Sequence, residues 1–369
     1  MKTVFIQNLI TPYRSRLFNK ICSKSKDFGV YYMGLTEADR NWDPNSIDVK
    51  HTHWIDRIGL YFMFRGLHIH INPCLVFKIL FSRNIKNVIL GVSYCDLNIL
   101  FLVLCKRLRL TRKTLYMWSE ANYLTNGSRK SSRLKDFLRR FLYGAIDGGV
   151  IVPGQMAKIS FEKWGIKINR YIDLPNTIND EQLSYEPLNR SDNALPLFVF
   201  PVRLDEKIKG VLNFFNAIGL ENIKKAKFVI AGDGPDRQRY QDYICDNKLE
   251  DHISLAGFLD SSQLSALYNQ ANAMVLPSYS DSSPLSLVEG LYFHLPILCS
   301  NHCGNNYETV DNGKNGYTFS PFEPLEIKQA FESFMNRREE WIQMGEISAQ
   351  KYEHFNVDVL ADRIIQELS

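Results

Sequence analysis

Two carboxylates, Asp281 and Glu289, flank the start of an expected helix in the segment "SDSSPLSLVEG", with seven residues between them. The run "AMVLPS" before them is strand-like. Ser283 is a good N-cap, and Pro284 suits the first helical position, where the backbone N–H has no partner in any case. The pattern therefore predicts a strand, a short polar loop and a helix that carries the second acid.

The start of this helix is suited to binding a phosphate. The backbone N–H groups of Leu285 and Ser286 would be free at the positive end of the helix dipole. The helix follows a strand at the sheet edge where open α/β folds bind ligands. Glu289 could then reach ribose hydroxyls, with Asp281 on the other side of the phosphate. The alternative is a capped surface helix with two unrelated acids.

Two upstream loops add cations and glycines. In "PVRLDEKIKG", Arg203 follows a strand and Lys209 precedes a helix, an arrangement that suits a diphosphate whose charge grows as it leaves. In "IAGDGPDRQRY", Gly232 and Gly234 follow the next strand and allow close approach to a ligand. Taken singly, the first loop could be a solvated basic loop, and a lone G-x-G is weak evidence.

In this order, these segments resemble the second domain of glycosyltransferase family 4, retaining enzymes with the GT-B fold. The resemblance covers about 195–350 and is carried by "VRLDEKIKG", "IAGDGP", "SLAGF", "SDSSPLSLVEG" and "NHCGNNYETVDNGKNGYTF". It implies that Arg203 and Lys209 hold the donor diphosphate together with the amides near Leu285 and Ser286. It implies also that Glu289 holds the ribose.

The resemblance assigns the rest of the donor site to the neighbouring loops. Gly232 and Gly234 would line it, the turn at Gly257 and Phe258 would receive the base, and Asp281 would contact the sugar hydroxyls. The family usually has Glu where Asp281 stands, so the carboxylate here is shorter by about one methylene, roughly 1.5 Å of reach.

In the N-terminal half, "NLITPYRSRLF", "RNWD" and "LYMWSE" resemble enzymes that build bacterial surface polysaccharides such as O-antigen or capsule. The resemblance implies that Tyr13, Arg14 and Glu120 lie on the acceptor side. The family's glycine-rich first loop is absent, and its active-site His has no match, since Trp118, Ser119 and Glu120 occupy that region.

Apolar strand-like runs alternate with amphipathic stretches along the chain, which predicts parallel sheets covered by helices on both faces. We expect an α/β protein of GT-B type, with two Rossmann-like doubly wound domains facing a central cleft. The polar, proline-bearing stretch around 174–196 is the predicted seam. The expected parts are an N-terminal acceptor-binding domain over 1–172, a linker over 173–196, a nucleotide-sugar-binding domain over 197–350, and a C-terminal helix over 351–369 that packs back toward the first domain.

Charge is unevenly distributed. Residues 1–170 hold 28 Lys and Arg against 11 Asp and Glu, although the net charge of the whole chain is only +4. Basic clusters at 106–113 and 129–140, the second beside apolar side chains, predict attachment to an anionic membrane surface; the alternative is a solvated helix face. The apolar run 97–105 is too short for a bilayer span and predicts a buried helix.

The remaining patterns argue against other chemistries. Seven scattered cysteines suit a reducing cytoplasm. The pairs His51/His53 and His68/His70 lack further ligands at zinc spacing, and no D-x-D metal motif, P-loop or Ser-His-Asp elbow is present. We therefore expect no cofactor and no metal, and no nucleic-acid partner.

Together these features predict a cytoplasmic, metal-independent, retaining hexosyltransferase, peripheral at the inner face of the plasma membrane. It would move a sugar from a UDP- or GDP-linked donor to a saccharide acceptor on a lipid diphosphate, in the synthesis of a bacterial surface polysaccharide such as lipopolysaccharide. The alternatives are a sugar-nucleotide epimerase or hydrolase on the same scaffold, and an inactive partner subunit of a glycan-assembly complex.

Overall fold

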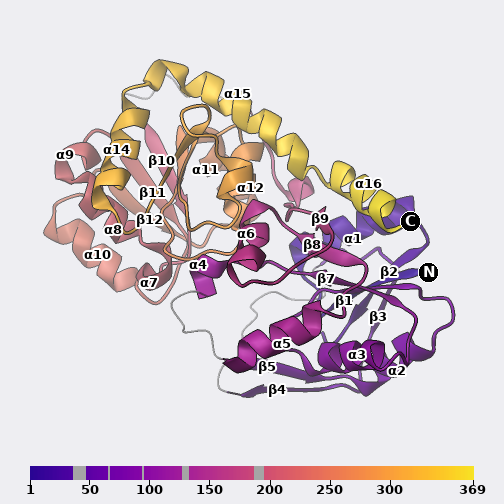
Figure 1. Ribbon diagram of the computed structural model, residues 1–369. Helices are drawn as coiled ribbons and strands as arrows, with labels where there is room; N and C mark the ends of the chain where they lie inside the picture. The colour runs from indigo at the N-terminus through magenta and orange to yellow at the C-terminus, as the bar shows by residue number, and fades with distance from the viewer. Residues whose placement is uncertain (36–46, 65–66, 94, 127–132, 187–194) are drawn as a thin grey trace. The chain divides into compact units, whose positions relative to one another are not determined.

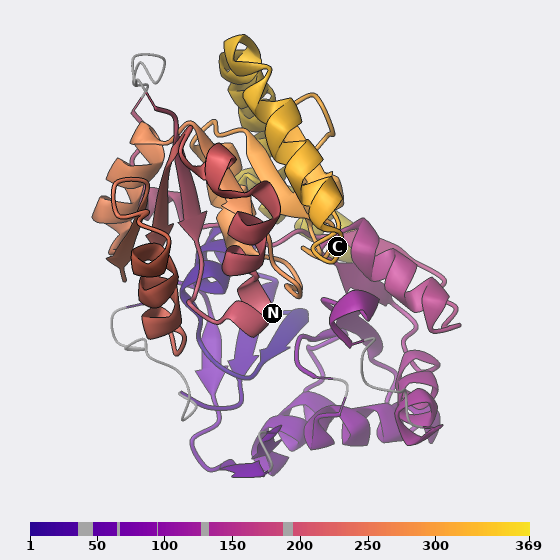
Figure 2. The same ribbon diagram turned by 90° about the vertical axis from the view of Figure 1, so that its left-hand side faces the viewer.

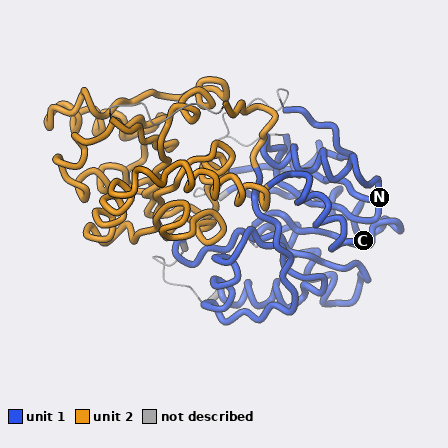
Figure 3. Tube along the Cα trace, turned by 90° about the horizontal axis from the view of Figure 1, so that it is seen from above, with its two compact units in different colours: residues 1–177, 356–369 blue, residues 178–355 orange. Residues whose placement is uncertain are grey.

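The computed structural model describes residues 1–35, 47–64, 67–93, 95–126, 133–186 and 195–369 (Figure 1). The segment "RNWD" at 40–43 and residues 129–132 of the second basic cluster lie outside these ranges. The chain forms two compact units. Unit 1 comprises Met1–Thr177 and Asn356–Ser369, and unit 2 comprises Ile178–Phe355 (Figure 3).

Unit 1 contains a seven-stranded sheet in the order β3-β2-β1-β6-β7-β8-β9, in which every pair is parallel. A separate antiparallel hairpin joins β4 to β5. The strands are β1 (Thr3–Gln7), β2 (Phe28–Tyr32), β3 (His53–Ile55), β4 (Leu60–Phe64), β5 (Leu67–Ile71), β6 (Asn87–Leu90), β7 (Thr114–Trp118), β8 (Gly149–Val152) and β9 (Tyr171–Asp173). The helices are α1 (Pro12–Lys24), α2 (Pro73–Phe81), α3 (Leu97–Arg107), α4 (Tyr123–Asn126), α5 (Arg133–Tyr143), α6 (Gln155–Lys163) and α16 (Val357–Leu368).

The central strands of unit 1 are buried on both faces, as their continuous apolar runs predict. Side chains alternate between the faces, so Val4 and Ile6 of β1 enter one core while Phe5 enters the other. The first core includes residues of α2, α3 and α6, and the second includes residues of α1 and α16. The prediction of a parallel sheet between two helical layers is confirmed.

Unit 2 contains a parallel six-stranded sheet in the order β12-β11-β10-β13-β14-β15. Its strands are β10 (Leu197–Pro201), β11 (Lys227–Ala231), β12 (Ile253–Gly257), β13 (Ala273–Leu276), β14 (Ile297–Ser300) and β15 (Gly316–Phe319). Its helices are η2 (Asp180–Gln182), α7 (Glu206–Lys209), α8 (Val211–Ile218), α9 (Leu220–Ile223), α10 (Arg237–Asp246), α11 (Ser261–Gln270), α12 (Leu285–Tyr292), α13 (Asn306–Thr309), α14 (Pro324–Met335), η4 (Arg338–Glu340), α15 (Trp341–Tyr352) and η5 (Glu353–Phe355).

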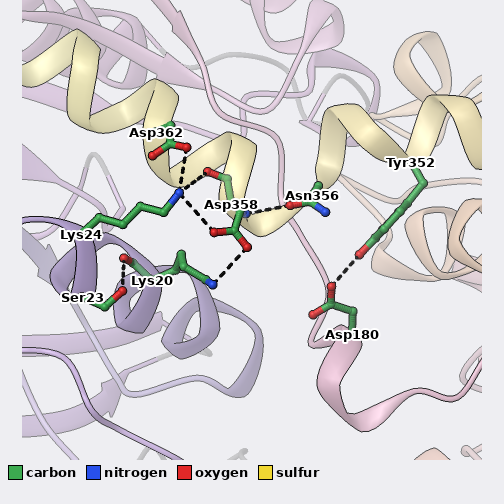
Figure 4. Close-up of polar contacts among 8 residues, drawn as sticks. All are labelled: Lys20, Ser23, Lys24, Asp180, Tyr352, Asn356, Asp358 and Asp362. Atoms are coloured by element: carbon green, nitrogen blue, oxygen red, sulfur yellow. Dashed lines mark hydrogen bonds and ion pairs between the residues drawn. The ribbon is translucent and has the colours of Figure 1, made fainter.

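The C-terminal helix α16 belongs to unit 1, where it packs against α1. Ion pairs reinforce this contact: Lys20 Nζ lies 3.0 Å from Asp358, and Lys24 Nζ lies 2.8 Å from Asp362 (Figure 4). The chain passes between units after Thr177 and after Phe355, instead of at the expected boundaries near 173, 197 and 351. The first residues of the expected linker, 173–177, therefore belong to unit 1, and those that follow belong to unit 2.

One local expectation was met only in part, and one element was not expected. The run 97–105 lies in α3, but this helix is only half-buried: Ile99, Leu102 and Val103 face the core, whereas Phe101 and Leu104 are exposed. The run is apolar on both sides of the helix, so its composition does not show that one side faces solvent. The hairpin β4–β5 has no counterpart among the expected strands.

Within the described ranges, no helix has the length and apolar character needed to cross a membrane.

Candidate functional site

The predicted donor-site residues of unit 2 gather at the carboxyl ends of β10, β11, β12 and β13. From β10 the sheet grows toward β11 and β12 on one side and toward β13, β14 and β15 on the other. The two directions of winding diverge between β10 and β13, and ligands of open parallel sheets bind outside such a divergence. Arg203 and Lys209 follow β10, whereas Asp281 and the start of α12 follow β13.

Lys209 and Asp281 form an ion pair across these two loops. Lys209 Nζ donates to Asp281 Oδ2 at 2.5 Å, and each side chain is 18% exposed. The two loops are also joined through the backbone, because the N–H of Tyr279 donates to the carbonyl of Ile208 at 2.8 Å. The predicted cation and acid are thus brought together, within reach of solvent.

A buried carboxylate holds the loop that carries Lys209. Glu206 is 6% exposed and accepts hydrogen bonds from the N–H groups of Leu212 and Asn213, both at 3.0 Å. It also accepts from the Tyr240 hydroxyl at 2.7 Å. These contacts satisfy amides in the first turn of α8 and anchor the short helix α7. Glu206 therefore positions Lys209, although it is not among the predicted residues.

The two glycines after β11 have a packing role. A Cβ on Gly232 would lie 2.0 Å from the carbonyl oxygen of Val202, and one on Gly234 would lie 2.5 Å from that of Leu204. The N–H of Gly232 donates to the carbonyl of Gly257 at 2.8 Å. Because these glycines have no Cβ, the loops after β10, β11 and β12 can pack closely together. The close approach that was predicted for a ligand is thus also made by the protein's own backbone.

The side chains of Phe258 and Arg203 extend away from the packed loops. Phe258 is 83% exposed. Arg203 is also exposed and has no hydrogen-bond or ion-pair partner within the part of the chain that the structure describes. Its guanidinium is therefore available to an anionic ligand at the carboxyl end of β10.

Helix α12 starts one residue later than predicted. Pro284, with φ −64° and ψ 122°, is the N-cap instead of Ser283, and no side chain caps the helix. The extended ψ of Pro284 keeps it outside the helix, and its carbonyl accepts from Asn305 Nδ2 at 3.0 Å. The amides of Leu285 and Ser286 precede the first helical bond, from Leu287 to Pro284, and the Ser286 hydroxyl donates to the carbonyl of Pro201.

Glu289 is held by a tyrosine. The hydroxyl of Tyr268, a buried residue of α11, donates to Glu289 Oε2 at 2.7 Å. Burial raises the pKa of Glu289, and the bond from Tyr268 partly counters this increase. Because Tyr268 binds one carboxylate oxygen, it sets the orientation in which the other can meet a ligand.

In unit 1, a cavity of about 800 Å³ lies at the corresponding divergence of the first sheet, between β1 and β6. Its lining comes from the ends of β1, β6 and β7, from the starts of α1 and α3, and from β5. The predicted acceptor-side residues Tyr13, Arg14 and Glu120 all line it. The structure therefore brings Glu120 beside Tyr13 and Arg14, which lie more than one hundred positions earlier in the chain.

Arg14 and Glu120 form the centre of a polar network in this cavity. Arg14 Nη2 donates to Glu120 Oε1 at 3.0 Å, Arg14 Nη1 donates to Gln7 Oε1, and the guanidinium lies 4.4 Å from the Trp118 ring centroid. Asn176 Nδ2 donates to the same Glu120 oxygen at 3.0 Å. Two donors therefore hold one oxygen of Glu120, and no bond to Oε2 is formed within the described ranges.

Three buried N–H donors of the cavity lack an acceptor among the described residues: Gln7 Nε2, Arg14 Nε and Trp118 Nε1. Gln7 and Trp118 are 2% and 4% exposed. A buried donor without a partner is costly, and such groups in native proteins usually meet water or a ligand. Unsatisfied donors beside a partly free carboxylate suit a ligand rich in hydroxyl oxygens.

Some of these residues could not be identified from sequence. Glu206 and Tyr268 look like ordinary members of a charged loop and of an amphipathic helix, because burial is not visible at a single position. Gln7 and Trp118 carry a weak signal, since each is the last residue of a strand. Polar or aromatic side chains at the carboxyl ends of parallel strands are candidates for a site.

The two histidine pairs have aromatic and hydrogen-bond partners instead of a metal-type arrangement. His51 Nε2 lies 2.8 Å from the Tyr32 hydroxyl, and its Nδ1 lies 2.7 Å from Asn19 Oδ1. His68 and His70 lie beside the Tyr61 ring. In the part of the chain that is described, no group of three or more His, Cys, Asp or Glu could hold a metal ion.

Comparison with known proteins relates residues 186–351 to the family described as Glycosyl transferases group 1. A relative from Campylobacter jejuni, named GalNAc-alpha-(1->4)-GalNAc-alpha-(1->3)-diNAcBac-PP-undecaprenol alpha-1,4-N-acetyl-D-galactosaminyltransferase, is 26% identical over 203 residues, 54% of each chain. The matches to this and two other curated relatives span 32% to 54% of the relatives' own length.

Solved structures match over nearly the whole chain. Anabaena Alr3699/HepE, in complex with UDP, has a TM-score of 0.74 at 14% identity and covers 100% of this chain and 99% of its own. A sucrose-phosphate synthase from Thermosynechococcus elongatus has a TM-score of 0.72 at 14% identity, over 99% and 98% of the two chains. The α/β fold is therefore that of the GT-B glycosyltransferases, as predicted.

Proposed function

We propose that the protein is a retaining glycosyltransferase of family 4 that moves a sugar from a UDP- or GDP-linked donor to a saccharide acceptor. The observation that carries this proposal is the Lys209–Asp281 ion pair beside the start of α12, at the divergence of the unit 2 sheet. This arrangement provides a cation for a diphosphate, free helix amides for its oxygens, and a carboxylate for sugar hydroxyls.

In the proposed reaction, Lys209 exchanges its contact with Asp281 for one with the donor diphosphate. Arg203 and the amides of Leu285 and Ser286 stabilise the charge that develops as the bond between the anomeric carbon and the diphosphate oxygen breaks. The acceptor oxygen attacks from the same face, and its proton passes to the departing diphosphate. We propose that these groups suffice without a resident metal ion.

The remaining donor contacts follow from the same loops. Glu289, oriented by Tyr268, binds the ribose, and the turn at Gly257 and Phe258 receives the base. Asp281, once released from Lys209, binds the hydroxyls of the transferred sugar. The smaller reach of Asp281 relative to the usual Glu implies a sugar that sits closer to the loop or is held through a different hydroxyl.

The acceptor is proposed to bind in the unit 1 cavity. The unsatisfied donors of Gln7 and Trp118 suit saccharide oxygens, and the uncommitted Glu120 Oε2 suits the attacking hydroxyl. The name of a relative includes a saccharide on PP-undecaprenol, and this supports an acceptor on a lipid diphosphate. We assign the transfer to surface polysaccharide synthesis at the cytoplasmic side of a membrane. The basic balance of residues 1–170 suits that anionic acceptor.

The test is a thermal-shift panel of nucleotide sugars and free nucleotides on the wild type, on Lys209→Ala and on the control Lys207→Ala, an exposed lysine of the same loop. One nucleotide sugar should raise the melting temperature of the wild type and the control but not that of Lys209→Ala. The product's anomeric configuration, determined by NMR, would test retention. Failure of every nucleotide to stabilise the wild type would overturn the donor assignment and favour an inactive partner subunit.

A further inference from the structure

Exposed apolar side chains concentrate in one part of unit 1. Eleven of the 21 exposed large apolar residues of the described chain fall between residues 58 and 110: Ile58, Leu60, Phe62, Met63, Phe77, Phe81, Leu97, Phe101, Leu104, Leu108 and Leu110. They come from β4, α2, α3 and the adjoining loops. Isolated exposed apolar residues are normal, but contiguous groups of them mark interaction surfaces.

These elements lie together in the fold. β4 pairs with β5, β5 packs against α3, and α3 packs against α2. Figures 1 and 2 show the hairpin beside the two helices within unit 1. We call the exposed side chains of this group the apolar face.

The periodicity on each helix shows that the exposure is organised. Leu97, Phe101 and Leu104 of α3, with Leu108 at its C-cap, follow the i, i+4, i+7, i+11 spacing of one helical stripe, and their exposed fractions run from 41% to 60%. In α2, Phe77 and Phe81 are one turn apart, are 53% and 77% exposed, and stack with ring centroids 6.0 Å apart. Each helix thus has an apolar side in the core and a second apolar side in solvent.

Cations border the apolar face at the carboxyl ends of both helices. Arg83 follows α2 and Arg109 and Arg112 follow α3; all three are exposed and have no partner within the described ranges. Lys113 joins the two loops, because its ammonium donates to the carbonyls of Ser82 at 2.7 Å and Ile85 at 2.8 Å. Between residues 58 and 113 the sequence has nine Lys and Arg and only Asp96 as an acid.

We propose that the apolar face docks unit 1 on an anionic lipid bilayer. The exposed side chains of α2 and α3 lie among the acyl chains, and Arg83, Arg109 and Arg112 lie at the headgroups. Apolar area and basic charge reinforce each other in peripheral attachment. The excess of basic over acidic residues favours an anionic bilayer over a second copy of this chain, whose matching face would carry the same charge.

The docking surface also adjoins the candidate acceptor cavity. β5 and the start of α3 contribute His68, Ile69 and Leu97 to the cavity, and Leu97 is itself half exposed. If the proposed function holds, a saccharide bound in the cavity can keep its lipid carrier in the bilayer under the apolar face. This last step rests on the proposed function, whereas bilayer binding does not.

Sedimentation with vesicles tests the docking. The wild type should sediment with vesicles of phosphatidylcholine and 30% phosphatidylglycerol, and much less with phosphatidylcholine alone. Phe77→Gln/Phe81→Gln should lower the partition coefficient at least about tenfold. Arg83→Gln/Arg109→Gln/Arg112→Gln should lower it by about fivefold per cation at low salt. The controls Leu325→Gln/Ile342→Gln and Lys224→Gln/Lys314→Gln/Lys328→Gln change equally exposed residues of unit 2 and should bind like the wild type.

Two outcomes would overturn the proposal. One is that the wild type stays in solution with the anionic vesicles, or that face and control variants bind alike. The other is a dimer, measured by sedimentation velocity, that Phe77→Gln/Phe81→Gln dissociates while vesicle binding is absent; the face would then belong to a second copy. Nucleotide-sugar binding by the same variants without vesicles reports separately on the proposed donor site, so failure of one proposal is distinguishable from failure of the other.

Discussion

Lys209 and Asp281, 72 positions apart in the chain, form an ion pair of 2.5 Å between the loops that follow β10 and β13. Both side chains are mostly buried but keep some contact with solvent. The pair occupies the divergence of the sheet, and in our proposal it must open when a donor binds. In the same proposal, Asp281 neutralises Lys209 while the site is empty and binds the sugar once a donor is present.

Asp281→Asn should separate these two roles. Loss of a partly exposed ion pair should lower the free energy of unfolding by only about 1 kcal/mol. Transfer should fall more than about tenfold, because the carboxylate contact to the sugar is lost. Chemical denaturation and steady-state transfer measure the two effects, with the exposed Asp246→Asn as the control. Unchanged transfer by Asp281→Asn would remove this residue from the site.

Replacing Glu289 by Gln should stabilise the protein in a pH-dependent way. Its pKa is raised in the folded protein, so the protonated form is favoured there and the ionised form is disfavoured once the pH passes the ordinary value of about 4.3. Glu289→Gln, which mimics the protonated form, should therefore melt higher than the wild type at pH 7, and the difference should shrink below about pH 4. The same variant should bind the donor more weakly. An equal melting temperature at pH 7 would contradict the inferred environment.

Tyr268→Phe should test the orientation of Glu289. Removal of the hydroxyl leaves a buried carboxylate oxygen without its donor, which should cost about 1–3 kcal/mol of stability at neutral pH. Adding Glu289→Gln should recover part of that loss, because the uncharged amide needs the donor less. Calorimetry of the four proteins in this cycle gives the coupling energy. Additive effects of the two changes would show that the bond seen at 2.7 Å carries no coupling.

Glu120→Gln should act on the acceptor alone. Its free oxygen is proposed to accept a hydrogen bond from the attacking hydroxyl, so the change should raise the KM for the acceptor or lower kcat by about tenfold or more. Donor affinity, measured by calorimetric titration, should stay the same. Glu162→Gln, an exposed acid of α6, is the matched control. A weaker donor affinity in Glu120→Gln would place this residue outside the acceptor role.

His51 should make unit 1 sensitive to acid. Burial lowers the pKa of His51 to about 4, against about 6.5 for an ordinary histidine. Below pH 6.5 the unfolded chain binds a proton that the folded protein does not, so stability falls as the pH drops from about 6.5 to 4, by about 3 kcal/mol in all. Denaturation of the wild type and of His51→Gln across this range should show a weaker pH dependence in the variant; parallel curves would exclude His51 as the cause.

The sequence by itself determined the alternation of strands and helices that builds the two parallel sheets, and the loops that carry the predicted chemistry. Apolar runs such as "TVFIQ" and "AMVL" are strands because a parallel sheet buries both faces, and this burial leaves short, continuous apolar runs in the sequence. Arg203 and Asp281 were candidates because each lies in the loop after such a run, and Lys209 and Glu289 because they lie in the segments that follow those loops.

Only the tertiary structure decided which distant groups meet and which apolar residues face water. The contacts of Lys209 with Asp281 and of Tyr268 with Glu289 depend on strand order and helix packing, which no local pattern encodes. For the same reason, the run 97–105 looked like a buried helix: an apolar residue has the same identity on either side of α3. Its side is set by the sheet against which the helix packs, and this leaves Phe101 and Leu104 in solvent.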